Sequence, residues 1–120
     1  MAEPRKTGRR TSSRAKVNVP EEDAYGHVQP QVLEFEEAVL GALMIEQDAY
    51  SQVSEILRPE SFYDHRHQLI YEAIRTLNLQ QKPVDILTVT EHLNSTGRLE
   101  EVGGPFYITQ LSGKVASSAH

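Results

Sequence analysis

Residues 30–46 form the segment that most restricts how this chain can fold. They read PQVLEFEEAVLGALMIE and contain the longest nearly continuous apolar stretch of the sequence, with Pro30 as a helix-start signal. At the helical period, Glu34, Glu37 and Gly41 share one narrow sector, and apolar side chains spread over most of the remainder. We therefore predict a helix over residues 30–46 that is buried on nearly every side.

Gly41 does not fit a plain core helix. A glycine within a helix costs about 1 kcal/mol relative to alanine, so its presence indicates that another element approaches the backbone closely. The predicted helix over residues 66–79 and the segment Phe106–Leu111 are the two candidate neighbours. A glycine that is merely tolerated is the alternative.

Glu36 is the second unusual residue, because it projects among Leu33, Leu40 and Leu43. A carboxylate in such surroundings needs a partner. Glu36 lies near the first turn of its own helix, where free N–H groups and the positive end of the dipole can satisfy it. We favour this role over acid/base chemistry, since no second carboxylate, histidine or lysine shares its face within a turn.

Charge is divided unevenly along the 120 residues. Residues 1–19 contain six of the twelve Lys and Arg residues against the single acid Glu3. The remaining residues, 20–120, form an acidic body with a charge of about −10, in a chain whose net charge is −5. Residues 1–29 have no hydrophobic period, and we predict a disordered basic arm there. The arm could contact phosphates, or it could be a solvated tail.

Several classes of protein are disfavoured by composition. The sequence has no cysteine, which excludes disulfides and thiolate metal sites and suits a reducing cytoplasm. It also has no apolar run of the length that a membrane span or signal peptide needs.

Two further helices are predicted in the middle of the chain. Asp48 is a plausible N-cap for a helix through Leu57, with Ile56 on its apolar face. Phe62 and Tyr63 follow in a connector that can insert both aromatic rings into the core. Asp64 then caps a helix whose apolar positions recur at helical spacing.

Residues 84–95 are compatible with a strand or a helix. Their β-branched side chains suit a strand. However, Asp85 can cap a helix, Thr88 and Glu91 have capping-box spacing, and no second strand is available for pairing. We therefore predict a helix that ends at Gly97 as its C-terminal cap.

The last predicted helix follows a hinge at Gly103 and Gly104. Its expected anchors are Phe106, Ile108 and Leu111, and residues 112–114 are expected to break it. The Gly-Lys pair there does not form a phosphate-binding loop, since Ile108 replaces the first glycine and Val115 replaces the magnesium-binding Ser or Thr.

His65 and His67 are the nearest approach to a metal motif. Residues two apart on a helix point in nearly opposite directions, so both cannot bind one ion. We predict no catalytic, cofactor-binding or metal site. The residues alone predict an all-α fold, a small orthogonal bundle of about five to six helices that binds a partner.

The order of these motifs resembles the N-terminal domain of the bacterial replicative DNA helicase, the DnaB family. The residues that carry the resemblance are Pro30, Glu34, Glu36, Val39, Leu40, Gly41, Phe62, Tyr63, His67, Ile70, Pro83, Val84, Asp85, Leu93, Gly97, Leu99, Gly103, Gly104, Tyr107 and Leu111. We expect nine of them to be structural positions of the family: Glu36, Gly41, Phe62, Tyr63, His67, Asp85, Gly97, Gly103 and Gly104.

The resemblance implies a domain plan and a set of partners. Residues 30–114 would be the helical globule, and residues 115–120 would begin the connection to a helical hairpin and a C-terminal ATPase domain. The parent protein would be an ATP-dependent helicase of the bacterial cytoplasm, a hexamer built from dimers that uses ATP and Mg²⁺ in its C-terminal domain. Its expected partners are primase, a helicase loader and single-stranded DNA, with no membrane. A DNA-binding or adaptor module that uses the basic arm is the alternative.

Overall fold

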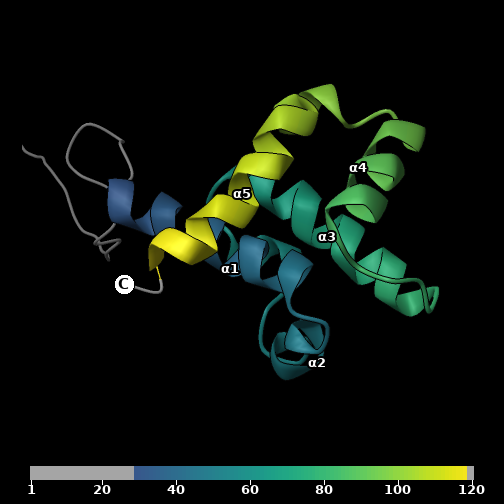
Figure 1. The fold of residues 1–120 in the computed structure, drawn as a ribbon, viewed down its shortest axis with the longest axis horizontal. Helices are drawn as coiled ribbons and strands as arrows, with labels where there is room; N and C mark the ends of the chain where they lie inside the picture. The colour runs from purple at the N-terminus through teal and green to yellow at the C-terminus, as the bar shows by residue number, and fades with distance from the viewer. Residues whose placement is uncertain (1–28, 119–120) are drawn as a thin grey trace, which may run out of the picture. The chain divides into compact units, whose positions relative to one another are not determined.

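The computed structural model describes residues 29–118 and folds them into five α-helices and two short 3₁₀-helices (Figure 1). The elements in chain order are α1 (Pro30–Ile45), α2 (Ala49–Val53), η2 (Pro59–Ser61), α3 (His65–Leu79), α4 (Ile86–Ser95), η3 (Glu100–Val102) and α5 (Gly104–Ser118). No strand occurs within residues 29–118, so the predicted all-α fold is confirmed. The basic arm predicted for residues 1–29 lies outside the described part of the chain, apart from Gln29.

Helix α1 is buried on one side only, so the prediction of burial on nearly every side is wrong. The ring of Phe35 is 72% exposed, and Pro30, Gln31 and Glu34 are also exposed. The buried positions recur at helical spacing: Glu36, Leu40, Gly41, Leu43 and Met44. A domain of this size has a single core, so one face of the helix finds apolar neighbours and the other does not.

Helix α3 lies between the other helices and supplies the largest share of the core (Figure 1). Asp64 caps its start as predicted, because the Asp64 carboxylate accepts a hydrogen bond from the Arg66 backbone N–H at 2.8 Å. The buried side chains of α3 are His67, Leu69, Ile70, Tyr71, Ala73, Ile74 and Leu77. Leucine, isoleucine and alanine side chains at this spacing form the stripe that packs against α4 and η3.

The segment between α1 and α3 differs from its prediction in three respects. Helix α2 ends at Val53, and Asp48 precedes it without a side-chain capping bond. Ile56 is 75% exposed instead of lying on an apolar face. Phe62 is buried against the ring of Tyr71, with ring centroids 5.1 Å apart, whereas Tyr63 remains 45% exposed. Consecutive residues in an extended connector point to opposite sides, so only one ring enters the core.

Helix α4 settles the ambiguity over residues 84–95 in favour of a helix. Asp85 and Thr88 form a reciprocal capping box, with the Thr88 N–H donating to Asp85 at 2.8 Å and the Asp85 N–H donating to Thr88 at 2.9 Å. Gly97 follows the helix with a φ of 76°, and the Arg98 N–H donates to the Leu93 carbonyl at 2.8 Å. This is the predicted glycine termination.

Helix α5 begins at Gly104 and continues through residues 112–114, so the predicted break there is wrong. A single helical glycine costs only about 1 kcal/mol, which the packing of a long helix offsets. Ile108 and Leu111 are fully buried as predicted, but Phe106 is 72% exposed and is not an anchor. Gly103 and Gly104 both have positive φ, at 103° and 80°, and form the sharp entry into the helix.

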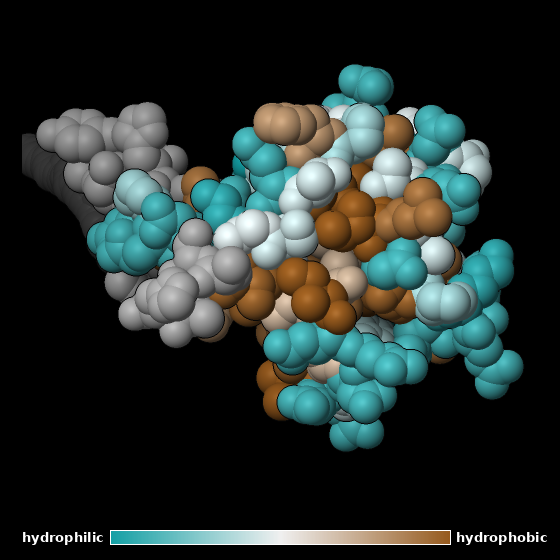
Figure 2. Space-filling view, viewed as in Figure 1, coloured by the Kyte–Doolittle hydropathy of each residue, from teal (hydrophilic) through white to brown (hydrophobic). Residues whose placement is uncertain are grey.

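The core gathers the buried faces of α1, α3, α4 and α5 around Tyr71, Ile70, Ile74 and Leu40. Apolar side chains also reach the surface of the face drawn in Figure 2, where hydrophilic side chains surround them. None of the helices within residues 29–118 has the length and apolar character needed to cross a membrane.

Candidate functional site

A buried network of polar side chains begins at Glu36 on α1. The Glu36 carboxylate accepts hydrogen bonds from the backbone N–H groups of Tyr63 and, at 3.3 Å, Asp64. Its Oε1 atom also lies 2.7 Å from Nδ1 of His67, the third residue of α3. Glu36 is 7% exposed and His67 is completely buried. These contacts join α1 to the start of α3.

The network continues from His67 to α5. Nε2 of His67 lies 2.6 Å from the hydroxyl oxygen of Tyr107, and that hydroxyl donates to Oε2 of Glu37 at 2.9 Å. The second carboxylate oxygen of Glu37 lies 3.4 Å from Nζ of Lys114. Burial and the hydrogen bond to Glu37 raise the pKa of the Tyr107 hydroxyl above its ordinary value, so it remains protonated. The network therefore returns to α1 through a second glutamate.

Arg66 and Asp64 lie beside this network. Burial works to raise the pKa of Asp64, but hydrogen bonds from the Arg66 side chain and backbone outweigh it and lower that pKa overall. The same pairing raises the pKa of Arg66. The Arg66 guanidinium stacks over the ring of Tyr107, 4.3 Å from its centroid. This stacking is a further contact between α3 and α5.

The predicted source of the Glu36 hydrogen bonds is wrong. Glu36 is satisfied by backbone N–H groups, but these belong to Tyr63 and Asp64 instead of its own helix. Glu36 lies in the second turn of α1, beyond the turn that carries the free N–H groups of a helix start. A partner 31 residues away, His67, completes its environment.

The network holds the helices of the domain together. The two ring nitrogens of His67 have partners within the domain, and the ring has no exposed surface. His65, by contrast, points outward to Glu101 at 2.9 Å. Within residues 29–118, no three His, Asp, Glu or Cys side chains are arranged to hold a metal ion. The arrangement is that of a structural clamp between α1, α3 and α5.

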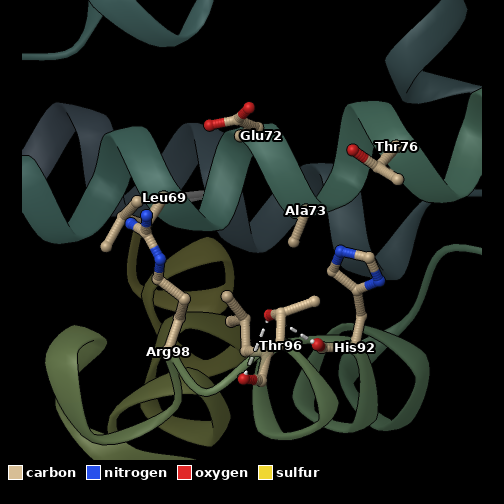
Figure 3. Close-up of a pocket in the computed structure, with 8 residues that line it drawn as sticks. Leu69, Glu72, Ala73, Thr76, His92, Thr96 and Arg98 are labelled. Carbon is tan, nitrogen blue, oxygen red and sulfur yellow. Dashed lines mark hydrogen bonds between the residues drawn. The ribbon is translucent and has the colours of Figure 1, made fainter.

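A shallow depression of about 180 Å³ lies between α3 and the end of α4 (Figure 3). Arg98 and His92 reach toward α3 from the opposite wall, and the Thr96 hydroxyl donates to the backbone carbonyl of His92 at 2.9 Å. Cofactor pockets usually enclose roughly 300–1,000 Å³. The depression is smaller than that range.

The nine residues expected from the family resemblance occupy several places in the fold. The backbone of Tyr63 and the side chains of Glu36 and His67 meet in the polar network. Gly41 faces the backbone of Leu111, which is one of the two neighbours proposed for it. Phe62 lies in the core, and the remaining four shape helix ends: Asp85, Gly97, Gly103 and Gly104.

The sequence indicated Glu36, His67 and Tyr107 individually but did not indicate that they meet. Glu37 and Lys114 were not singled out as a pair at all. The contacts join residues 31 to 70 positions apart, and no periodic pattern within one helix reports on such a contact.

Comparisons with known proteins agree with this fold. The sequence model of the DnaB-like helicase N terminal domain matches residues 28–120. The replicative DNA helicase DnaB of Rhodothermus marinus is 50% identical over 113 residues, which are 94% of this chain and 12% of that protein. The replicative DNA helicase DnaC of Bacillus subtilis is 44% identical over 91 residues, 76% of this chain and 20% of that protein. The chain thus spans a fifth or less of these relatives.

A solved structure shows the same architecture. The N-terminal domain of DnaB helicase from Mycobacterium tuberculosis matches with a TM-score of 0.67 and 38% sequence identity, over 69% of this chain and 58% of that one. Both the sequence and the fold therefore match this domain. We conclude that the chain belongs to the family of DnaB-like helicase N-terminal domains.

Proposed function

We propose that this chain is the non-catalytic collar domain of a replicative DNA helicase and serves protein–protein contact in hexamer assembly and primase recruitment. The observation that supports it best is the match, in sequence and fold, to an N-terminal domain of DnaB helicase. The inward-facing polar network agrees with this role, because its groups join helices of the domain to one another.

The parent protein, on this proposal, unwinds duplex DNA at the replication fork in the bacterial cytoplasm. Its ATP and Mg²⁺ would be bound by a separate C-terminal domain, and its subunits would assemble as dimers into a hexamer. A helicase loader and single-stranded DNA would be its further partners. Its relatives in Rhodothermus marinus and Bacillus subtilis are replicative DNA helicases, which supports the helicase activity.

The exposed aromatic rings are the best candidates for partner contact. Phe35 on α1 and Phe106 on α5 are each 72% exposed. Protein–protein interfaces are enriched in aromatic residues, whereas leucines are under-represented among the residues that dominate binding. Leu79 and Leu87 are similarly exposed, at 69% and 68%, and provide matched comparisons.

Two measurements on the purified chain test the proposal. We expect no ATP hydrolysis above background, and we expect saturable binding to the primase of the same bacterium by calorimetry. At least one of the variants Phe35→Ser and Phe106→Ser should bind primase about tenfold or more weakly than the parent. The control Leu79→Ser should bind primase nearly as the parent does. ATP turnover by the chain, or failure to bind primase, would contradict the collar assignment.

A second candidate function is DNA binding by the basic arm, favoured by the six Lys and Arg residues within positions 1–19. The acidic body argues against it, because a groove-reading domain normally presents a basic face. Measuring the DNA affinity of the full chain and of a chain that starts at Gln29 tests this candidate function. If the arm binds DNA, the full chain alone will show affinity that falls steeply with salt.

A further inference from the structure

Four side chains of the polar network form a chain of three short contacts. Glu36 and His67 are 2.7 Å apart, His67 and Tyr107 are 2.6 Å apart, and Tyr107 and Glu37 are 2.9 Å apart. All three distances are those of hydrogen bonds, and each hydrogen bond needs one hydrogen between its two atoms. The three contacts therefore need three hydrogens in total.

The ordinary charge states of these groups supply only two. Ionised Glu36 and Glu37 accept hydrogen bonds and donate none, a neutral imidazole carries one N–H, and Tyr107 carries one O–H. Tyr107 donates its single hydrogen to Glu37. With a neutral imidazole, either the contact with Glu36 or the contact with Tyr107 would then place two lone pairs against each other.

We infer that the folded domain holds one additional proton in this cluster, carried by His67, and that this proton fastens α5 to α1 and α3. The imidazolium donates from Nδ1 to Glu36 and from Nε2 to Tyr107. Both glutamates already have donors facing them, because Glu36 accepts two backbone N–H groups and Glu37 faces Lys114. The hydrogen bonds that join α5 to α1 and α3 in this cluster thus depend on the proton.

The charges around the cluster balance only when this proton is present. Three carboxylates face it, Glu36 and Glu37 from α1 and Asp64 from the start of α3. Two cations face it, Arg66 over the Tyr107 ring and Lys114 from α5. Without the proton on His67, these three carboxylates and two cations leave one excess negative charge in a mostly buried place. With the proton, the charges cancel. The neighbouring η3 contributes Glu101, which is exposed and paired with His65.

Removing the proton would weaken the attachment of α5. The Tyr107 hydroxyl would then have one hydrogen for two acceptors, His67 and Glu37, so one of the two contacts is lost. The buried side chains of Ile108 and Leu111 on α5 are apolar, so their packing does not depend on pH. We therefore expect alkaline conditions to loosen α5 selectively, before the rest of the core.

Histidine ring resonances test this inference directly. In the full chain labelled with ¹⁵N-histidine, with His67 assigned by a His67→Gln variant, both ring nitrogens of His67 should have the shifts of protonated nitrogens at about pH 7.5. A single ring proton on His67 under these conditions overturns the inference.

Unfolding equilibria provide the second measurement. The native state keeps a proton that the unfolded chain releases above about pH 6.5, so the unfolding equilibrium constant should rise with pH by up to about tenfold per unit. Tyr107→Phe should flatten this dependence, since Nε2 of His67 then has no acceptor. Tyr71→Phe, which removes a buried hydroxyl outside the cluster, should keep the dependence of the parent between about pH 6.5 and 9, below the range in which tyrosines ionise.

Parallel pH profiles for the parent and Tyr107→Phe would also overturn the inference. If Tyr107→Phe does not fold, the ring resonances of the parent chain decide the question alone.

Discussion

The backbone of Gly41 in α1 lies against the carbonyl group of Leu111 in α5, and a Cβ at position 41 would come within 2.1 Å of that oxygen. The same Cβ would lie 2.8 Å from a methyl group of Val115. A backbone carbonyl in the middle of a helix cannot move aside easily. Glycine is therefore required at this crossing for reasons of space.

Gly41→Ala should destabilise the domain by about 1–3 kcal/mol, because overpacking forces the two helices apart. Chemical denaturation with circular dichroism measures this. Gly113→Ala is the matched control, since Gly113 is also helical but a Cβ there would have nothing within 4 Å. That control should stabilise the domain by about 0.4–1 kcal/mol through the unfolded state. Equal stability of the two variants would show that the helices do not need the close approach.

Asp85→Ala should cost about 1 kcal/mol, because it removes the acceptor of the Thr88 N–H at the start of α4. Asp48→Ala tests the same chemistry where the structure shows no capping bond, and it should change stability by less than about 0.5 kcal/mol. Thermal melts of the two variants give the comparison. A larger loss at Asp48 than at Asp85 would mean that the two helix starts are assigned wrongly.

Asp64 should contribute to resistance against acid. Its pKa is lowered in the folded state below the ordinary 3.8, mainly by Arg66 against the opposing effect of burial. The unfolded chain therefore binds a proton more readily than the folded one, so this stability is present above about pH 4 and is lost as the pH falls through the folded value. Asp64→Asn should lower the free energy of unfolding at neutral pH. It should also flatten the acid limb of the plot of this free energy against pH.

The control for this prediction is Glu91→Gln, which removes an exposed carboxylate from α4. It should leave the acid limb nearly unchanged. If Asp64→Asn and the parent lose stability in parallel below about pH 4, the pairing with Arg66 does not operate in solution.

Tyr71 should make the domain sensitive to strong alkali. Burial raises the pKa of its hydroxyl to about 12, and the hydroxyl donates to the Leu57 carbonyl at 2.8 Å. The folded state holds this proton more tightly than the unfolded state, so the contribution is complete below about pH 10 and is lost as the pH rises through about 12. Tyrosinate absorbance during alkaline titration should show this delayed ionisation.

Tyr71→Phe should cost about 1 kcal/mol at neutral pH, because the Leu57 carbonyl loses its donor. It should also remove part of the alkaline dependence and leave the part due to Tyr107. An unchanged absorbance titration would contradict the assignment of the delayed ionisation to Tyr71.

Helix positions were predictable where the signals are local. Asp64 and Asp85 cap α3 and α4, and Gly97 ends α4, through bonds between residues two to five positions apart. These bonds depend on residue type and spacing alone, which a sequence displays. The choice of helix over strand for residues 84–95 was correct, and it rested partly on the Asp85 cap and partly on the lack of a second strand. The capping box, however, pairs Asp85 with Thr88, whereas the spacing had suggested Thr88 with Glu91.

Exposure was predicted less well, because it depends on where the neighbouring elements lie. Phe35, Tyr63 and Phe106 were expected to be buried on account of their side chains, yet all three are exposed. The continuity of α5 through Gly113 was missed for a related reason. A glycine penalty of about 1 kcal/mol is visible in the sequence, but the packing that offsets it is not.

The polar network could be predicted only in pieces. Glu36 was identified as a carboxylate in need of a partner, and His67 was named as a family position. Their meeting with Tyr107 depends on the placement of three helices, and the contacts span 31 and 40 residues. Spacing along one helix contains no information about such a meeting.

Helices α1 and α5 contact each other at two places, and these places are one helical turn apart on each helix. Glu37 and Gly41 are four residues apart on α1, and their partners Tyr107 and Leu111 are four residues apart on α5. Inserting one residue between Tyr107 and Leu111 would turn the two α5 positions about 100° relative to each other. Only one of the two contacts could then form. The spacing of residues 107–111 is therefore fixed, and this turn of α5 cannot accept the insertions that surface loops accept.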